Sequence, residues 1–266
     1  MTSLVFGRYY ATSSPVHRMD ARIKVTLLLA YILVVLLAAN PGALALCAAF
    51  TAGFYVCARI PAGVAVRAVL PLSFIVVITA LINLFWTQGG ATLASLGFLR
   101  ISEAGAYQAL FMGCRLTLLL FGACLLTLTT TTLDVTDAAE DMLRPFARFG
   151  LPAHELSMMA GIALRFLPQF VTELEHIRNA QASRGAQMTD RSLKERYGAA
   201  KSLVIPLFVS VFRHAETLAN AMDARCYHGG GGRTRLHEAR MEGRDFAAAG
   251  VMAVMALLCA AAGLLL

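Results

Sequence analysis

Five long apolar runs separate the charged stretches of this chain, which has 266 residues. In chain order they cover residues 23–39, 43–58, 68–86, 106–128 and 246–266. A helix needs about 20 mainly apolar residues to cross a bilayer, so the first two runs suffice only if they stand nearly upright. Hydrophobic residues make up 58% of the chain and charged residues 15%, which is too apolar for an ordinary soluble domain. The pattern predicts an all-α membrane protein with about five transmembrane helices.

The distribution of Lys and Arg predicts the orientation of these helices. With the N-terminus in the cytoplasm, and with Lys24 counted in the N-terminal segment, 21 of the 22 Lys and Arg residues other than Arg115 face the cytoplasm, as the positive-inside rule requires. The C-terminus then lies outside. The formal charge of +7 is not read as nucleic-acid binding, because the charges alternate with apolar runs. Arg115 lies inside the fourth run, either as a structural pairing or snorkelling residue or as a contact for a partner subunit.

A long segment between the fourth and fifth runs predicts a separate helical domain. Threonines before Asp134 favour a helix over about 135–149. Two longer helices are expected over about 153–184 and 193–227, each kinked at an internal proline, Pro168 or Pro206. Their apolar residues recur mostly at steps of three or four, at Leu156, Met159, Ala163, Phe166, Phe170 and Ile177, and at Val204, Phe208, Val211, Ala215, Leu218 and Met222.

These elements divide the chain into three parts. Residues 1–133 form a membrane domain with four spans, 134–245 a cytoplasmic coupling domain of long kinked helices, and 246–266 a C-terminal transmembrane helix. The position of 134–245 on the cytoplasmic side follows from its 15 Lys and Arg residues.

The two long helices have matching ends, each with the pattern Asn-Ala-x-x-x-Arg, at 179–184 and 220–225. One interpretation is simple capping, since arginine offsets the dipole of a helix C-terminus and Gly185 suits a left-handed turn. However, Arg184 and Arg225 each lie seven residues after an apolar position of the stripe, so each continues a packing face. The second interpretation is therefore that each arginine docks in a groove of another protein.

Motifs for several kinds of chemistry are missing from the sequence. No lysine follows a glycine, so there is no P-loop for ATP. His154-Glu155 and His237-Glu238 begin like zinc-protease motifs but lack the second histidine. There is no G-x-S-x-G motif and no C-x-x-C pair. We expect no catalytic residues, no cofactor, no metal site and no enzyme activity of its own.

The chain resembles, over nearly its whole length, the transmembrane T component of energy-coupling factor transporters, the vitamin and metal-ion uptake branch of ATP-binding cassette importers. The resemblance lies in S-P-V-H-R-M-D-A-R at 14–22, L-P-A-H-E-L at 151–156, A-L-R-F at 163–166, A-M-D-A-R-C-Y at 221–227 and G-R-T-R at 232–235. The family carries two Ala-Arg-Gly motifs at the tips of its coupling helices. The corresponding residues here are Ser183-Arg184-Gly185 and Ala224-Arg225-Cys226.

The resemblance implies a membrane scaffold without a substrate site of its own. Its partners would be two ATPase subunits, bound through the arginine tips, and a small membrane protein, the S component, that captures a vitamin or metal ion. ATP binding would move the coupling helices, and the S component would reorient in the bacterial cytoplasmic membrane. Cys226 stands where the family has glycine, which adds steric strain if the left-handed turn is kept.

A self-contained secondary transporter is the alternative to the scaffold. The spans show no inverted repeat, and they contain few charged groups for an ion path. Transport by the purified chain alone favours the carrier, whereas co-purification with two ATPases favours the scaffold.

Overall fold

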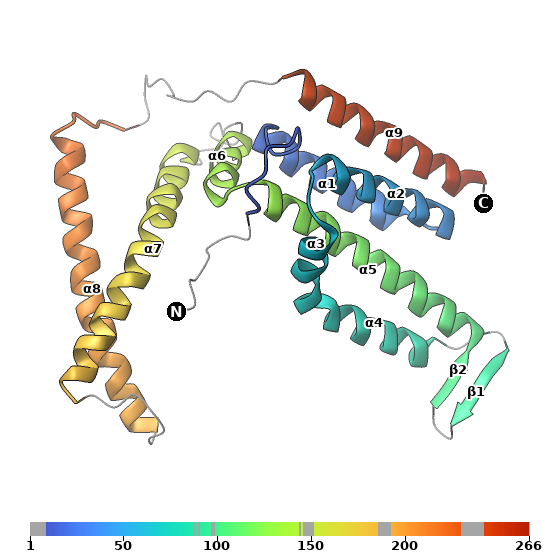
Figure 1. Ribbon diagram of the computed structural model, residues 1–266, viewed down its shortest axis with the longest axis horizontal. Helices are drawn as coiled ribbons and strands as arrows, with labels where there is room; N and C mark the ends of the chain where they lie inside the picture. The colour runs from blue at the N-terminus through green and yellow to red at the C-terminus, as the bar shows by residue number, and fades with distance from the viewer. Residues whose placement is uncertain are drawn as a thin grey trace. The chain divides into compact units, whose positions relative to one another are not determined.

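The computed structural model describes residues 9–87, 89, 91–96, 99–143, 145, 152–185, 193–229 and 242–265. Its elements are α1 (Ala21–Leu37), α2 (Pro41–Cys57), α3 (Ala62–Val69), the short 3-10 helix η1 (Leu70–Leu72), α4 (Ser73–Trp86), β1 (Thr92–Leu96), β2 (Leu99–Ser102), α5 (Glu103–Thr129), α6 (Thr132–Leu143), α7 (Ala153–Ser183), α8 (Leu193–Asp223) and α9 (Gly243–Leu265) (Figure 1). The predicted all-α membrane class is confirmed, with one small antiparallel hairpin, β1–β2, added to it.

The chain forms two compact units. The first unit joins Met1–Ala138 to Glu238–Leu266, and the second is Ala139–His237. The first therefore holds α1 to α5 and α9, and the second holds α7 and α8. Whether the second unit lies in the cytoplasm, as the sequence predicts, is a question of topology that stays a prediction.

Four helical segments of the described chain are long and apolar enough to cross a membrane, namely Ala62–Trp86, Glu103–Thr129, Tyr197–Asp223 and Gly243–Gly263. Pro41–Cys57 is apolar but shorter. Three of the four segments, together with this shorter helix, match expected spans. The expected first span corresponds to α1, which has 17 residues and carries Arg22 and Lys24, so its crossing stays a prediction. Tyr197–Asp223 was not expected among them, and it is the least apolar of the four.

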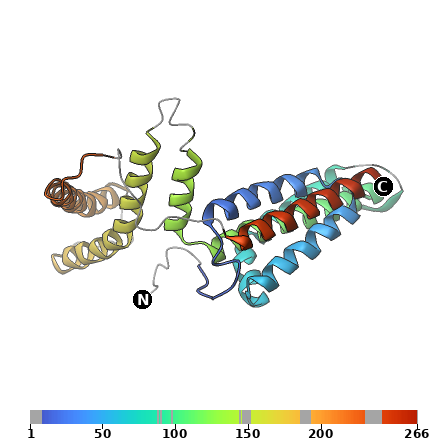
Figure 2. The same ribbon diagram turned by 90° about the horizontal axis from the view of Figure 1, so that it is seen from above.

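In the first unit, α5 is the central helix. It contacts α1, α2, α3 and α4, and α4 lies on the opposite side of α5 from α1 and α2 (Figure 1). The last helix, α9, packs across both α1 and α2 (Figure 2). The core of this group consists of Tyr31, Val35, Ala38, Ala43, Leu44, Cys47, Met252, Met255 and Cys259.

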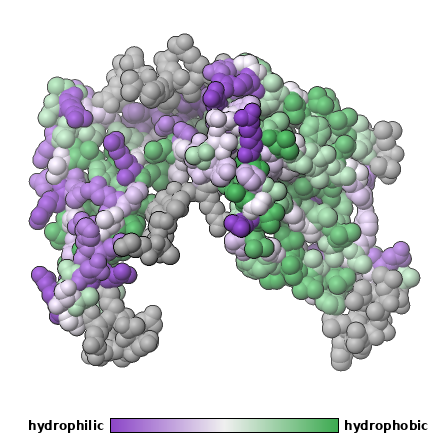
Figure 3. All heavy atoms as spheres, in the orientation of Figure 1, coloured by the Kyte–Doolittle hydropathy of each residue, from purple (hydrophilic) through white to green (hydrophobic). Residues whose placement is uncertain are grey.

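The first unit exposes many apolar side chains, most clearly on α4. None of its residues is buried, and it exposes large apolar side chains such as Phe74, Ile78 and Trp86. The visible face of this unit is largely apolar (Figure 3). Such a surface is stable only when hydrocarbon or another protein covers it, in agreement with a membrane domain.

Polar contacts fix α2 against α9 in an antiparallel arrangement. Asn40, just before α2, donates from Nδ2 to the carbonyl of Ala262. About two turns further along α2, Cys47 Sγ lies 3.5 Å from Cys259 Sγ in the core, and both thiols are free. The last helix is thereby held in the fold of the first unit rather than attached at its edge.

Tyr31 crosses the centre of the first unit and needs a glycine beside it. Its hydroxyl lies 2.8 Å from Thr51 Oγ1 and donates to the carbonyl of Leu118 at 3.1 Å. Its ring lies against Gly122 of α5, where a Cβ atom would sit 2.3 Å from the ring carbon Cε1. A side chain at this position therefore has to displace a ring that two polar contacts hold.

Gly122→Ala is expected to lower the free energy of unfolding by about 1–3 kcal/mol, the usual effect of overpacking a core. The matched control is Gly113→Ala on the same helix, where the nearest neighbour of the new Cβ is Val76 Cγ1 at 4.0 Å. That change should be neutral or stabilising, because alanine is the better helix former. Unfolding of both variants in mixed micelles measures the difference, and equal stability of the two would show that Tyr31 does not pack on Gly122.

Arg115 serves the structure of the first unit. Its guanidinium donates to the carbonyl of Ala38, the C-cap residue of α1, and lies 4.7 Å from the centre of the Phe111 ring. A cation at a helix C-terminus offsets the helix dipole, and the aromatic face adds a cation–π contact. The geometry favours the structural interpretation of this arginine over contact with a partner.

The motif at 14–22 fastens the N-terminal segment to the ends of α5 and α9. His17 donates from Nε2 to the carbonyl of Tyr10 and accepts at Nδ1 from the Ser14 hydroxyl, 2.7 Å away. Burial lowers the pKa of His17 below its ordinary value of 6.5, which agrees with this neutral tautomer. The backbone N–H of Asp20 donates to Asp245 Oδ1 of α9.

Lys24 occupies the centre of this contact region. Its Nζ donates to the carbonyl of His17 at 3.0 Å and to that of Thr129 at 2.9 Å, and the residue is only 8% exposed. Burial disfavours the charged ammonium, and the nearby carboxylates of Asp134, Asp245 and Asp20 offset part of that cost. The ends of α1, α5 and α9 and the start of α6 thus meet around one ammonium group.

Three details differ from the sequence-based expectation. Residues 59–67 were expected to be a loop, but α3 begins at Ala62 and includes Arg67. With its 8 residues α3 is too short to span a membrane, but it continues through η1 into α4. Residues 87–105 contain the β1–β2 hairpin, whose strands are too short to stand out in the sequence. The helix α6 begins at Thr132 rather than near 135, and the rest of the expected 135–149 helix beyond residue 145 lies outside the described residues.

Candidate functional site: a helix pair with two arginine tips

The helices α7 and α8 form an antiparallel pair within the second unit (Figure 1). Each has 31 residues and continues through its internal proline, Pro168 or Pro206. The expected long helices are confirmed, while the kinks at the prolines stay a prediction. At 1.5 Å per residue each helix is about 45 Å long.

A polar clasp joins the two helices near their middle. Gln169 Nε2 donates to His214 Nε2 at 2.7 Å, and His214 Nδ1 donates to the carbonyl of Ser210. The hydroxyl of Ser210 in turn donates to Glu173 Oε1 at 3.2 Å. The rings of Phe166 and Phe170 meet the imidazole edge-on. These contacts fix the register of α7 against α8.

Apolar residues continue the contact beside the clasp. A cleft of about 290 Å³ lies between the helices. Its walls include Ala163, Phe166 and Phe170 of α7, and Val211, Ala215, Leu218 and Met222 of α8. These are members of the two stripes expected from the sequence, so that part of each stripe packs against the other helix.

The remaining apolar residues of the pair are exposed. On α8 they form a second face, made of Val204, Ile205, Phe208, Val209 and Phe212, each 46–69% exposed. Leu156 and Met159 of α7 are 41% and 55% exposed. Among the side chains that the structure describes in 139–229, none is buried. The pair therefore has a contact face but no core, and large apolar surfaces of this kind mark interaction sites.

The first arginine tip ends α7. Ser183 is the last helical residue and Arg184 the C-cap, with its backbone N–H bonded to the carbonyls of Ala180 and Gln181. Gly185 has φ 84° and donates to the carbonyl of Ala182 at 3.0 Å. Glycine is the usual residue for this left-handed position. The turn is therefore held by backbone bonds, and the Arg184 side chain is exposed.

The second arginine tip ends α8 in the same way. Cys226 has φ 56° and donates to the carbonyl of Asp223 at 2.9 Å, while Tyr227 donates to that of Met222 at 3.1 Å. This pair of bonds is a Schellman motif, with Cys226 at the left-handed position. The left-handed turn is kept although the residue is not glycine, and Arg225, just before it, is exposed.

Cys226→Gly is expected to stabilise the second tip by up to about 1 kcal/mol, because a non-glycine residue is strained in the left-handed region. Ala224→Gly is the control, since it places glycine inside the last helical turn and should destabilise by about 0.5–1 kcal/mol. Hydrogen exchange of the amides of residues 226 and 227 reports the local change. Faster exchange in Cys226→Gly than in the parent would show that Cys226 is not strained.

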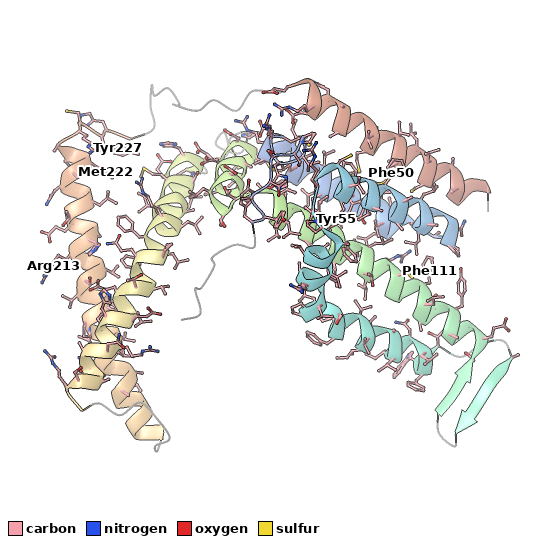
Figure 4. The ribbon with its side chains drawn as sticks, in the orientation of Figure 1. Phe50, Tyr55, Phe111, Arg213, Met222 and Tyr227 are labelled. Carbon is pink, nitrogen blue, oxygen red and sulfur yellow. The ribbon has the colours of Figure 1, made fainter. Side chains whose placement is uncertain are left out.

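The two tips lie at opposite ends of the helix pair. Tyr227, two residues after Arg225, donates from its hydroxyl to Met158 Sδ near the start of α7 (Figure 4). Arg184 follows at the other end of α7. About 26 residues of helix separate these levels, which corresponds to about 40 Å. The structure thus presents two similar turns, each carrying one exposed arginine, at a separation that suits two different binding sites.

Sequence reasoning placed the six tip residues but missed the clasp. Gln169 and Glu173 are four residues apart on α7, as are Ser210 and His214 on α8. Polar pairs at this spacing lie on one face of a helix, and two such faces on antiparallel helices can meet. These two polar pairs were the sequence signal from which the clasp could have been predicted. The G-R-T-R motif at 232–235 and His237 lie outside the described residues.

Comparison with known proteins identifies the family. The family model described as cobalt transport protein, CbiQ, matches residues 12–237. The energy-coupling factor transporter transmembrane protein EcfT of Listeria innocua is 39% identical over 245 residues, which cover 92% of both chains. Those of Bacillus subtilis and Thermosediminibacter oceani are each 38% identical, over 92% and 96% of this chain.

The match extends from the N-terminal motif through both arginine tips. The family model matches most of the chain, and the relatives are 38–39% identical over nearly the whole of each chain. Together these matches assign the chain to one family. The chain belongs to the CbiQ family of cobalt transport proteins and is a transmembrane T component of the energy-coupling factor type.

Proposed function

We propose that this chain is the membrane scaffold of an energy-coupling factor importer, and that Arg184 and Arg225 each dock on one of two cytoplasmic ATPase subunits. The tip residues Ser183, Arg184, Gly185, Ala224, Arg225 and Cys226 form the two docking sites. The scaffold transmits the motion of the ATPases to an S component that takes up a micronutrient, a vitamin or a metal ion.

The observation that carries this proposal is the pair of matched tips about 40 Å apart. Both turns are closed by backbone hydrogen bonds, so neither arginine side chain is needed to hold its helix end. Among the described residues, no hydrogen bond or ion pair of either guanidinium is found. A planar guanidinium on a fixed turn suits a groove lined with carboxylates or carbonyls.

The exposed apolar face of α8 is the surface we assign to the S component. Phe208 and Phe212 are 58% and 69% exposed, and the described side chains of this unit provide no core to cover them. A membrane partner with its own apolar surface would bury them. The polar clasp leaves this face free, because it joins α7 and α8 on another side of α8.

The orientation of the second unit is part of the proposal. By length and composition Tyr197–Asp223 is apolar enough to cross a membrane. Its antiparallel partner α7 is not, and it carries charged residues such as Arg165, Glu173 and Arg178. The polar clasp between the two helices, with Gln169 exposed, also fits an aqueous setting. We therefore place α7 and α8 in the cytoplasm, with the N-terminus, and the C-terminus outside the cytoplasmic membrane.

Co-expression tests the scaffold. A tagged chain, produced together with the two ATPases of its own cell, should retain both ATPases on purification, and the complex with an S component should take up substrate in proteoliposomes only with ATP. The purified chain alone should show neither ATP hydrolysis nor uptake. Uptake by the chain alone, driven by an ion gradient, would establish the secondary transporter instead.

A further inference from the structure

The first unit contains a groove on the surface between α2 and α9 that the scaffold role leaves unused. The N-terminal turn closes one end of it, and its volume is about 580 Å³. This is the size of a site for a small molecule rather than for a helix of another protein. Ala49 and Gly53 of α2 and Ala247 and Ala248 of α9 line it, with Phe50 beside them (Figure 4).

The lining of the groove is apolar except at one end. Among its lining residues the single charged side chain is that of Arg244, in the first turn of α9. Because α2 and α9 are antiparallel, Arg244 lies at the end where α2 finishes, with Cys57 also in the lining. The groove thus has one cationic end, and its remaining length between the two membrane helices is apolar.

Two more arginines lie close in sequence to residues that line the groove. Arg18 belongs to the same turn as Val16 and Met19, which line the groove. Arg59 follows Cys57 by two residues. Both arginines are exposed.

The acidic groups nearby do not cancel this positive charge. Glu242 pairs with Arg244 and neutralises one of the three arginine charges, so Arg18 and Arg59 supply the excess positive charge at this end. Asp245 is buried and accepts from the backbone N–H groups of Asp20 and Glu242, so its carboxylate is turned into the protein.

We infer that this groove binds one phospholipid with an anionic headgroup, its phosphate at Arg244 and an acyl chain between α2 and α9. Basic pockets at the ends of transmembrane helices bind anionic lipid headgroups, and the apolar channel excludes a soluble anion as the whole ligand. This inference needs only a membrane-embedded first unit and is independent of the ATPase docking sites.

Native mass spectrometry of the purified full chain tests the inference. The probes are dioleoyl-phosphatidylglycerol, dioleoyl-phosphatidylcholine with the same chains, and soluble glycerol 1-phosphate. The parent should retain one phosphatidylglycerol in preference to phosphatidylcholine, and glycerol 1-phosphate should not displace it. Equal retention of both lipids would mean that the lipid only surrounds the protein without selectivity. Displacement of phosphatidylglycerol by glycerol 1-phosphate would mean that the site recognises phosphate alone. Either result overturns the inference.

Two variants separate the headgroup from the chain. Arg244→Gln should reduce phosphatidylglycerol retention about five-fold, since one arginine near the surface contributes about that much, and should leave phosphatidylcholine unchanged. Gly53→Phe should abolish retention of the bound lipid by filling the groove. A Cβ at Gly53 meets no heavy atom within 4 Å, so a side chain can leave the backbone there without a clash.

Matched controls lie outside the groove. Gly250→Phe adds the same ring to α9 at a position that is also open and does not line the groove. Arg213→Gln removes an exposed arginine from α8. Both should retain phosphatidylglycerol as the parent does. Retention by Gly53→Phe at the parent level, or equal loss in Gly53→Phe and Gly250→Phe, would overturn the assignment of the acyl chain to this groove.

Discussion

Replacing Arg184 and Arg225 together by alanine is expected to abolish co-purification of the ATPase subunits with a tagged chain. If each arginine is a desolvated anchor, each single change should weaken binding by about 2–5 kcal/mol, or roughly 30-fold and more. The backbone bonds that close both turns do not involve the side chains, so the variant should still fold and insert. Each single variant should already uncouple ATP hydrolysis from uptake, because both tips hold one assembly.

The same helices supply controls for this experiment. Arg178 on α7 and Arg213 on α8 are exposed and precede the tip arginines by six and twelve residues; Arg213 is labelled in Figure 4. Arg178→Ala with Arg213→Ala removes the same net charge and should leave ATPase recovery unchanged. If the tips are only caps, Arg184→Ala and Arg225→Ala should each cost a few tenths of a kcal/mol of helix stability. Full ATPase recovery with the double tip variant would then end the docking hypothesis.

Lys24→Met is expected to lower the free energy of unfolding of the chain by about 2–5 kcal/mol, because two carbonyls lose a buried charged donor and each buried group left unpaired costs about 1–3 kcal/mol. The change leaves the carbonyls of His17 and Thr129 without their donor. It also removes a positive charge that interacts favourably with the nearby carboxylates of Asp134, Asp245 and Asp20. Methionine keeps the length of the aliphatic chain, so the loss reports the charge and its hydrogen bonds rather than packing.

Unfolding in mixed micelles measures this loss, followed by helix content. Lys201 on α8 is exposed, and Lys201→Met should change stability by less than about 0.5 kcal/mol. If Lys24→Met and Lys201→Met unfold alike, the N-terminal motif does not depend on its lysine for fastening α1, α5 and α9 together.

Periodicity and charge were enough to predict the long elements. The spans, α7 and α8 have apolar repeats over many turns, and their ends have strong signals, such as the left-handed Gly185. The two helix ends with their arginines were predicted because the pattern occurs twice, and their role as docking sites stays a prediction. Shorter elements escaped: α3 has only 8 residues, and the strands of the hairpin have five and four. Such segments owe their structure to contacts with neighbours, which a pattern within one segment does not contain.

Contacts between distant residues were the other limit. Asp245 and Asp20 are 225 positions apart, and Gln169 and His214 are 45 apart. In the sequence Lys24 is a cation at the edge of an apolar run, and only the fold shows that it is buried among carbonyls and carboxylates. The same holds for Gly122, which reads as one glycine among many until the Tyr31 ring is placed beside it.

The clasp at Gln169 and His214 is the point about which α7 and α8 could rotate against each other. It lies about 22 Å along α7 from Arg184 and about 17 Å along α8 from Arg225, so the arms on its two sides are similar. A pivot of about 10° about the clasp moves each tip by about 3–4 Å, from these arm lengths. Because the described side chains of the pair form no buried core, such a pivot breaks little packing. The clasp would then be the pivot of this rotation. The strength of its hydrogen bonds would determine how much of a movement at Arg184 is transmitted to Arg225.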